Sequence, residues 1–169
     1  MIVHLSNVAL LRISRRGNRR AAGILGRMAI YCALGDSMSI DEYAGGGGRG
    51  AGSLLTTRLG HTLHLLARDG ATSDDVVGLQ LDQLADAPDL VTVTMGGNDL
   101  LTALFSPAGP AVLAAIDMNW LAHKIAGNTA RVLDRLVGTG ALVVVSTVYD
   151  PTDGTGDLSG SGCRRYRTV

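Results

Sequence analysis

The sequence predicts an α/β fold in which helices cover both faces of a parallel sheet. From residue 29 onward, short apolar runs alternate with stretches of helical periodicity. The last apolar run, 142–148, is rich in valine, which is typical of a strand buried on both faces. Strands separated by helices need right-handed crossovers, and such crossovers make neighbouring strands parallel. The 169 residues, 46% of them hydrophobic, suffice for one domain.

Each expected element has its own signal in the sequence. The strands are expected at 29–34, 62–67, 90–95 and 142–148. The helices are expected at 53–59, from Thr72 or Ser73 to Leu84, shortly after Asp99, and at 112–137. An acidic pair, Asp74 and Asp75, suits the N-terminal dipole of the second helix. Gly138 and Gly140 end the last helix.

Glycine-rich and polar turns follow the expected strands. The turn Gly35–Ser39 comes after the first strand, Gly70 comes shortly after the second, Gly96–Asp99 follows the third, and 147–150 follow the fourth. Ligands of parallel sheets bind outside the carboxyl ends of the strands, so we expect these turns to meet in one site. A serine, a glycine N–H and an asparagine amide would supply a nucleophile and oxyanion donors there.

These motifs, in this order over residues 28–162, resemble those of the GDSL, or SGNH, hydrolase family. Each motif alone is an ordinary turn sequence. The three together, each after a strand-like run, form a specific combination. The resemblance implies a flavodoxin-like three-layer sandwich, and it implies ester hydrolysis with no metal or organic cofactor.

The roles that the resemblance implies suit the chemistry of the residues. Ser37 corresponds to the nucleophile. Its own N–H, the N–H of Gly70 and the side-chain amide of Asn98 correspond to the oxyanion hole. Glycine lets the backbone approach a reacting carbonyl closely, and the amide is a fixed neutral donor. The remaining motif residues are expected to support the turns: Asp36, Gly97 and Asp99.

The sequence departs from the family's pattern at the general base. The family places an Asp-x-x-His beyond the last strand, and no aspartate of this chain has a histidine three residues later. The four histidines, His4, His61, His64 and His123, all precede the last expected strand. The fifth strand and last helix of the family are missing as well, so we interpret the chain as truncated at its C-terminus. Impaired hydrolysis of small-molecule esters is expected, and the alternative is a non-catalytic fragment or binding module.

Two further patterns do not match the sites they suggest. Residues 45–52 contain G-x-G-x-x-G, but they start about ten residues after the first strand, whereas a dinucleotide-binding turn follows its strand directly. We interpret them as a mobile loop beside the site, which disfavours a nucleotide-binding function. The aspartates of 150–157 lack the alternating spacing of a calcium loop. Neither a metal nor an organic cofactor is therefore expected.

Charge is unevenly distributed, although the net charge is zero. Residues 1–27 hold six arginines and no acidic residue, and we expect a basic leader that is disordered or lies upstream of the true start, Met28. Residues 28–162 hold fifteen acidic and six basic residues, which argues against nucleic-acid binding. Residues 163–169, with three arginines, form a tail.

The sequence gives weaker indications of compartment. Arg12 interrupts the apolar run 8–11, so a secretory signal is not expected, and no stretch reaches the roughly 20 apolar residues of a membrane helix. We expect a cytoplasmic protein; secretion through an atypical leader and the oligomeric state stay open. Cys32 is expected in the core and Cys163 in the tail, with no disulfide framework.

Overall fold

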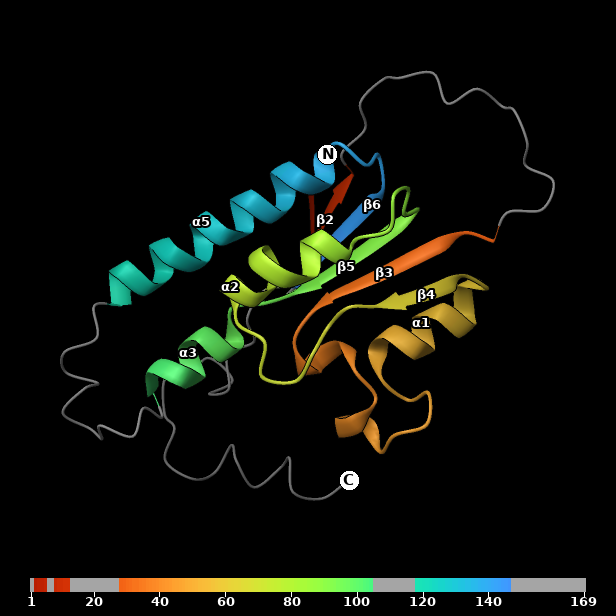
Figure 1. The fold of residues 1–169 in the computed structure, drawn as a ribbon, viewed down its shortest axis with the longest axis horizontal. Helices are drawn as coiled ribbons and strands as arrows, with labels where there is room; N and C mark the ends of the chain where they lie inside the picture. Colours follow the sequence, from red (N-terminus) through yellow and green to blue (C-terminus); the bar gives the residue numbers. More distant parts are fainter. Residues whose placement is uncertain (1, 6–7, 13–27, 105–117, 147–169) are drawn as a thin grey trace.

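The computed structural model describes residues 2–5, 8–12, 28–104 and 118–146 (Figure 1). The strands of this part of the chain form a single sheet in the order β1-β2-β6-β5-β3-β4. The helices lie on both sides of the sheet, with α5 and α2 on one side and α1 on the other. The predicted α/β layers are therefore confirmed.

Four strands run parallel and form the centre of the domain. They are β3 (Ile30–Gly35), β4 (Thr62–Leu65), β5 (Leu90–Thr94) and β6 (Leu142–Ser146). In the register, Cys32 lies opposite Val91, and Val91 lies opposite Val143. The strands β3 and β5 end level with each other, which brings the turns that follow them to the same edge. All four predicted strands are found, with starts and ends within two residues of the prediction.

The connections contain helices and short helical turns. They are η1 (Ser37–Ser39), η2 (Glu42–Ala44), α1 (Ala51–Leu59), α2 (Ser73–Asp75), η3 (Val76–Gln80), η4 (Leu81–Gln83), α3 (Gly97–Leu104) and α5 (Met118–Val137). The helix predicted to follow Asp99 starts two residues earlier, because the Gly96 carbonyl already accepts a bond from the Leu100 N–H. Of the helix predicted at 112–137, residues 112–117 lie outside the described part.

The helix predicted from Thr72 or Ser73 to Leu84 is divided into three conformations. Thr72 caps α2: its hydroxyl accepts a bond from the Asp75 N–H, and the Asp75 carboxylate accepts one from the Thr72 N–H. The α-helix then widens into the π-helical turn η3, in which the Leu81 N–H bonds to the Val76 carbonyl, and ends as the 3-10 turn η4. Such π turns are frequent at functional sites.

The core consists of two clusters, one on each face of the sheet. Alternate side chains point to opposite faces, so the larger cluster takes Cys32, Leu34, Val91, Val93 and Val143 from the strands, together with Val76, Val132 and Leu136 from the helices above them. The smaller cluster takes Tyr31, Ala33 and Leu90, packed against partly buried Leu55, Leu63 and Val144. Cys32 lies in the core as predicted, and burial raises the pKa of its thiol.

The N-terminal residues differ from the expected disordered leader in two segments. β1 (Ile2–Leu5) and β2 (Val8–Arg12) pair antiparallel with each other, and β2 pairs antiparallel with β6. Val8 lies opposite Ser146 and Arg12 opposite Leu142, so the pairing covers the whole of β6. The edge of β6 that does not face β5 is thus occupied by β2. Residues 13–27 and the expected tail, 163–169, lie outside the described residues.

Candidate active site

The three sequence motifs lie side by side at the carboxyl edge of the parallel strands. A Cβ atom on Gly97 would come within 3.8 Å of the Asp36 carboxylate, so the turn after β5 lies against the turn after β3. The Asn98 amide donates a hydrogen bond of 2.9 Å to the Ala71 carbonyl, which joins the turn after β5 to the Gly70 loop. The structure therefore brings Ser37, Gly70 and Asn98 to one edge of the sheet.

The turn that carries Ser37 begins at a position only glycine can occupy. Gly35 has φ +119°, and a Cβ atom there would lie 1.8 Å from the Thr94 carbonyl oxygen. Gln80, 1% exposed, binds both polar backbone groups of Gly35: its side-chain carbonyl accepts from the Gly35 N–H at 2.6 Å, and its amide donates to the Gly35 carbonyl at 2.8 Å. The π turn η3 ends at Gln80, so it delivers the side chain that fixes the start of the Ser37 turn.

Asp36 shapes the turn from within. Its carboxylate is buried and accepts a hydrogen bond of 3.1 Å from the Met38 N–H, while its own N–H donates to the Thr94 hydroxyl at 3.1 Å. Ser37, between these residues, is half-buried. Within the described residues, the Ser37 hydroxyl has no hydrogen-bond partner, so it is available to an incoming group.

The backbone and side-chain donors assigned to the oxyanion hole are also available. Gly70 is exposed, has φ +69°, and a Cβ atom added to it would meet nothing within 4 Å. Its N–H, like that of Ser37, has no acceptor in the described part of the chain. Asn98 uses one amide hydrogen on the Ala71 carbonyl, and an amide nitrogen carries two.

Asp99 acts across the site instead of within its own turn. Its buried carboxylate accepts two bonds from Ser73, one from the N–H at 2.7 Å and one from the hydroxyl at 2.8 Å. Ser73 is the first residue of α2 and lies three residues after Gly70. The contact therefore ties α3 to α2, next to the tie between Asn98 and Ala71.

Two side chains of α5 extend this network. The Asn128 amide donates to the Ser73 hydroxyl at 2.9 Å and to the Asp74 carboxylate at 2.7 Å. The Lys124 ammonium lies 2.6 Å from Asp74 and 3.6 Å from Asp99. The bond from Lys124 lowers the pKa of Asp74, with Asn128 contributing, and the bond to Asp74 raises the pKa of Lys124. The Lys124 ammonium and the Asn128 amide of α5 thus compensate the negative charge of Asp74 and Asp99.

Among the described residues, no histidine forms a hydrogen bond with Ser37. His61 directly precedes β4, and its Nδ1 is 3.0 Å from the Leu59 carbonyl oxygen. His64 is the third residue of β4 and lies opposite Cys32, five residues before Ser37. His123 lies on α5, with Nδ1 2.7 Å from the Asn119 carbonyl oxygen. His4 lies in β1, at the outer edge of the sheet. The absence of a general base among the four histidines stays a prediction.

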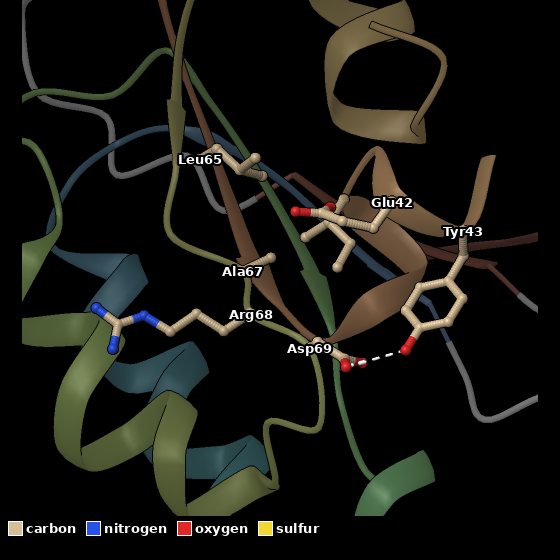
Figure 2. A pocket seen from close by; sticks show the side chains of 7 residues that line it. Glu42, Tyr43, Leu65, Ala67, Arg68 and Asp69 are labelled. Atoms are coloured by element: carbon tan, nitrogen blue, oxygen red, sulfur yellow. Dashed lines mark hydrogen bonds between the residues drawn. The ribbon is translucent and has the colours of Figure 1, made fainter. Parts of the chain in front are cut away.

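A cavity of about 450 Å³ lies between the segment after Ser37 and the segment before Gly70 (Figure 2). Its apolar wall consists of Ile40, Leu65 and Ala67, and its polar wall of Glu42, Tyr43, Arg68 and Asp69. The Tyr43 hydroxyl donates to the Asp69 carboxylate at 2.9 Å. The Arg68 side chain points away from Glu42 and Tyr43, and its charge lowers the pKa of Asp75 as a minor contribution. The cavity therefore has one apolar wall and one polar wall, and the polar wall carries two carboxylates and one guanidinium.

The glycine-rich loop differs from a nucleotide-binding turn, as expected. Gly45, Gly46, Gly47 and Gly48 all have positive φ, between 59° and 86°. The Asp41 carboxylate closes the loop by accepting bonds from the Gly48 N–H at 2.8 Å and the Gly50 N–H at 2.7 Å. Within the described residues no cluster of His, Cys, Asp or Glu side chains could hold a metal ion, and no helix is long and apolar enough to cross a membrane.

Sequence reasoning missed three residues that hold the site together. Gln80 and Asn128 are distant from the motifs in sequence, Ser73 was considered only as a possible helix start, and all three are buried by the fold. The available signal was a polar residue on an apolar helix face: Gln80 precedes the core residue Leu81, and Asn128 lies four residues before Val132 on α5. The expected strand-end residues 147–150 lie outside the described part of the chain.

Comparison with known proteins agrees with this geometry. The family model of the GDSL-like lipase/acylhydrolase family matches residues 33–168, a range that extends beyond the domain end expected at Gly162. The fold is similar to that of an extracellular lipase from Streptomyces rimosus, with 27% identity, 68% of this chain and 58% of the lipase covered, and a TM-score of 0.50.

A second solved structure shares the fold. Phospholipase A1 from Streptomyces albidoflavus is 22% identical, with 69% of this chain and 58% of that enzyme covered and a TM-score of 0.50. This chain thus spans less than two thirds of the length of either enzyme. No curated protein matches the sequence. The family match covers most of the chain, and the chain therefore belongs to the GDSL-like lipase/acylhydrolase family.

Proposed function

We propose that this chain carries a serine acyl-transfer site for small-molecule esters. The observation that supports it most is the meeting of three turns at one sheet edge, with the Ser37 hydroxyl and the N–H groups of Ser37 and Gly70 unpaired among the described residues. In the proposed reaction, Ser37 Oγ forms a bond to the ester carbonyl carbon. The carbonyl oxygen then becomes an oxyanion, stabilised by both N–H groups and the Asn98 amide.

The second half of the reaction releases the alcohol. The tetrahedral intermediate collapses, the bond between carbon and the alkoxy oxygen breaks, and the proton lost by Ser37 passes to the alcohol. Water then hydrolyses acyl-Ser37 and returns the proton to Oγ. A serine hydroxyl without an adjacent base is a weak nucleophile at neutral pH. Since no described histidine forms a hydrogen bond with Ser37, slow turnover by the 169-residue chain is part of the proposal.

The cavity beside the site is the proposed place for part of the ester. It lies between Ile40, three residues after the nucleophile, and Asp69, which precedes Gly70. Its apolar wall suits hydrocarbon. Its polar wall carries the carboxylates of Glu42 and Asp69 and the single guanidinium of Arg68, and this excess of negative charge disfavours an anionic substituent. We therefore propose neutral esters over esters that carry a carboxylate or phosphate group.

The test is the covalent reaction of Ser37 with a neutral alkyl fluorophosphonate, followed by intact-protein mass spectrometry. The wild-type chain is compared with Ser37→Ala, each with and without about 0.1 M imidazole, which supplies a free general base. We expect slow labelling at Ser37, a several-fold increase with imidazole, and none in Ser37→Ala. Equal labelling of both proteins would contradict the assignment of Ser37.

The alternative is a non-catalytic module of the same fold, and the positions of the described histidines favour it over a fully active esterase. Hydrolysis of an activated aryl ester separates the two functions. Turnover that disappears in Ser37→Ala supports the enzyme. A folded protein whose Ser37 reacts with neither the ester nor the fluorophosphonate, even with imidazole, supports the non-catalytic module.

A further inference from the structure

We infer that Asn128, on α5, is a positioning residue for the oxyanion donors, acting through Ser73 and Asp99. The inference rests on the proposed function, because it concerns the donors of that same site. Asn128 lies 30 residues after Asn98 in sequence and belongs to no motif of the chain. Its side chain nevertheless ends a buried chain of hydrogen bonds that leads from α5 to the Gly70 loop and to the start of α3.

The path of hydrogen bonds is continuous and almost fully buried. The Asn128 amide donates to the Ser73 hydroxyl at 2.9 Å, and that hydroxyl donates to the Asp99 carboxylate at 2.8 Å. The exposed fractions are 4% for Asn128, 0% for Ser73 and 4% for Asp99. Buried hydrogen bonds are stronger than exposed ones, and an unpaired member is costly, so such a network has one preferred arrangement.

The direction of the bonds gives Asn128 a specific task. The Ser73 hydroxyl has a single hydrogen, and orienting it toward Asp99 leaves its lone pairs facing the other way. The Asn128 amide meets those lone pairs and so favours the orientation in which Ser73 donates to Asp99. The second Asn128 contact, to Asp74 at 2.7 Å, fixes the amide relative to α2. Lys124, 3.6 Å from Asp99, adds a positive charge on the same side.

The network ends beside both donors of the proposed oxyanion hole. Asp99 directly follows Asn98, and Ser73 lies three residues after Gly70. Two ties therefore set the spacing between the Gly70 loop and α3: the bond from Asn98 to Ala71 and the bonds from Ser73 to Asp99. Only the second tie is supported from α5. Loss of the Asn128 amide should loosen it, and displacements well below 1 Å already weaken an oxyanion contact.

The experiment measures the labelling of Ser37 by a neutral fluorophosphonate, with imidazole as the added base, over a range of reagent concentrations. Asn128→Ala is expected to lower the limiting labelling rate about tenfold, while the half-saturating reagent concentration stays within twofold. A residue that only stabilises the fold would lower neither quantity in the folded protein. Thr129→Ala is the matched control: among the described residues its hydroxyl bonds only to the Ile125 carbonyl of the same helix, and its labelling rate should equal that of the wild type.

Coupling through Ser73 is tested by a double-mutant cycle. If Asn128 acts through Ser73, the double variant Asn128→Ala/Ser73→Ala should label no more slowly than Ser73→Ala alone. Additive losses in rate would contradict the path. If Ser37 is labelled in the wild type and Asn128→Ala is labelled at the same rate, the positioning role is overturned and the proposed function stands.

A second measurement separates failure of the inference from failure of the proposed function. If Ser37 of the wild type is not labelled at all, the proposed function fails, and the positions of the donors are read instead by ¹⁵N NMR. Asn128→Ala should then shift the side-chain amide signal of Asn98 and the backbone signals of Ser73 and Gly70, and Thr129→Ala should not. Unchanged signals in Asn128→Ala would overturn the inference independently of any reaction.

Discussion

The two faces of the sheet differ in how they are covered and in what they do for the site. On one face, α2, η3 and α5 bury the larger core cluster and also contribute Ser73, Gln80 and Asn128, the polar side chains that hold the motif turns. On the other face, α1 covers the smaller cluster. The cover is incomplete, because two strand leucines on this face stay exposed, Leu142 at 38% and Leu65 at 41%. Packing and site geometry are therefore concentrated on the same face, so substitutions there should affect both.

The largest difference between the faces should appear in matched leucine substitutions. Leu136→Ala removes a fully buried side chain of α5 from the larger cluster, and we expect a loss of about 3 kcal/mol in the free energy of unfolding. Leu55→Ala, on the partly buried face of α1, should cost about 1 kcal/mol. Urea unfolding followed by circular dichroism measures both. Equal losses would show that the two faces are equally packed.

The next effect concerns the backbone of Gly35, two residues before the nucleophile Ser37. Gln80→Leu keeps the volume but leaves the buried Gly35 N–H without its acceptor, and we expect a loss of about 2 kcal/mol in the free energy of unfolding. Gln83→Leu is the control, because in the described part of the chain its exposed amide bonds only to the Leu79 carbonyl one turn away; its change should stay within about 0.5 kcal/mol. A Gln80→Leu variant as stable as Gln83→Leu would contradict the role given to Gln80.

A smaller effect is expected at the cap of α2, and it depends on pH. Bonds from the Thr72 hydroxyl and then the Thr72 N–H lower the pKa of Asp75. A lowered pKa stabilises the folded state above the unfolded-state pKa, about 4, and this stabilisation disappears as pH falls through the folded-state value. Thr72→Ala should cost about 1 kcal/mol at pH 7 and progressively less below pH 4. A cost independent of pH would exclude the contribution of Asp75.

The smallest effect on folding is expected from removal of residues 1–27. The core clusters described above are built from residues after Met28, so a chain that starts there should keep its helical circular dichroism. It would lose β1 and β2 and expose the edge of β6, which favours pairing between molecules. Size-exclusion chromatography should then show more associated protein than for the full chain. Loss of the helical signal would show that the two N-terminal strands are needed for folding.

The sequence predicted the local features of the fold well and its long-range contacts poorly. The apolar run 142–148 and the helix start at Thr72 or Ser73 depend on neighbouring residues; the strand was found over the part that the structure describes, and of the two possible caps the structure has Thr72. The π turn at η3 was missed, because nothing local distinguishes it from a continuing α-helix; it is stabilised by the contact of Gln80 with Gly35, 45 residues away.

The same distinction holds for the candidate site. The motif residues Ser37, Gly70 and Asn98 were visible because each follows a strand-like run. Asn128 was not, because a single asparagine in an amphipathic helix resembles an exposed residue until the helix is packed against Ser73. The pairing of β2 with β6 was also missed, since the arginines around the short apolar run 8–11 favoured a solvated segment.

The oxyanion hole is tested most sharply by comparing the reactivity and the stability of Asn98→Ala. One Asn98 amide hydrogen binds the Ala71 carbonyl, and in the proposed reaction the other binds the oxyanion. Labelling of Ser37 by a neutral fluorophosphonate, with imidazole present, should therefore slow by about 100-fold in this variant. The free energy of unfolding should fall by only about 1 kcal/mol, for the lost bond to Ala71. A labelling rate unchanged in a protein destabilised by that amount would make Asn98 a structural turn residue and contradict the account.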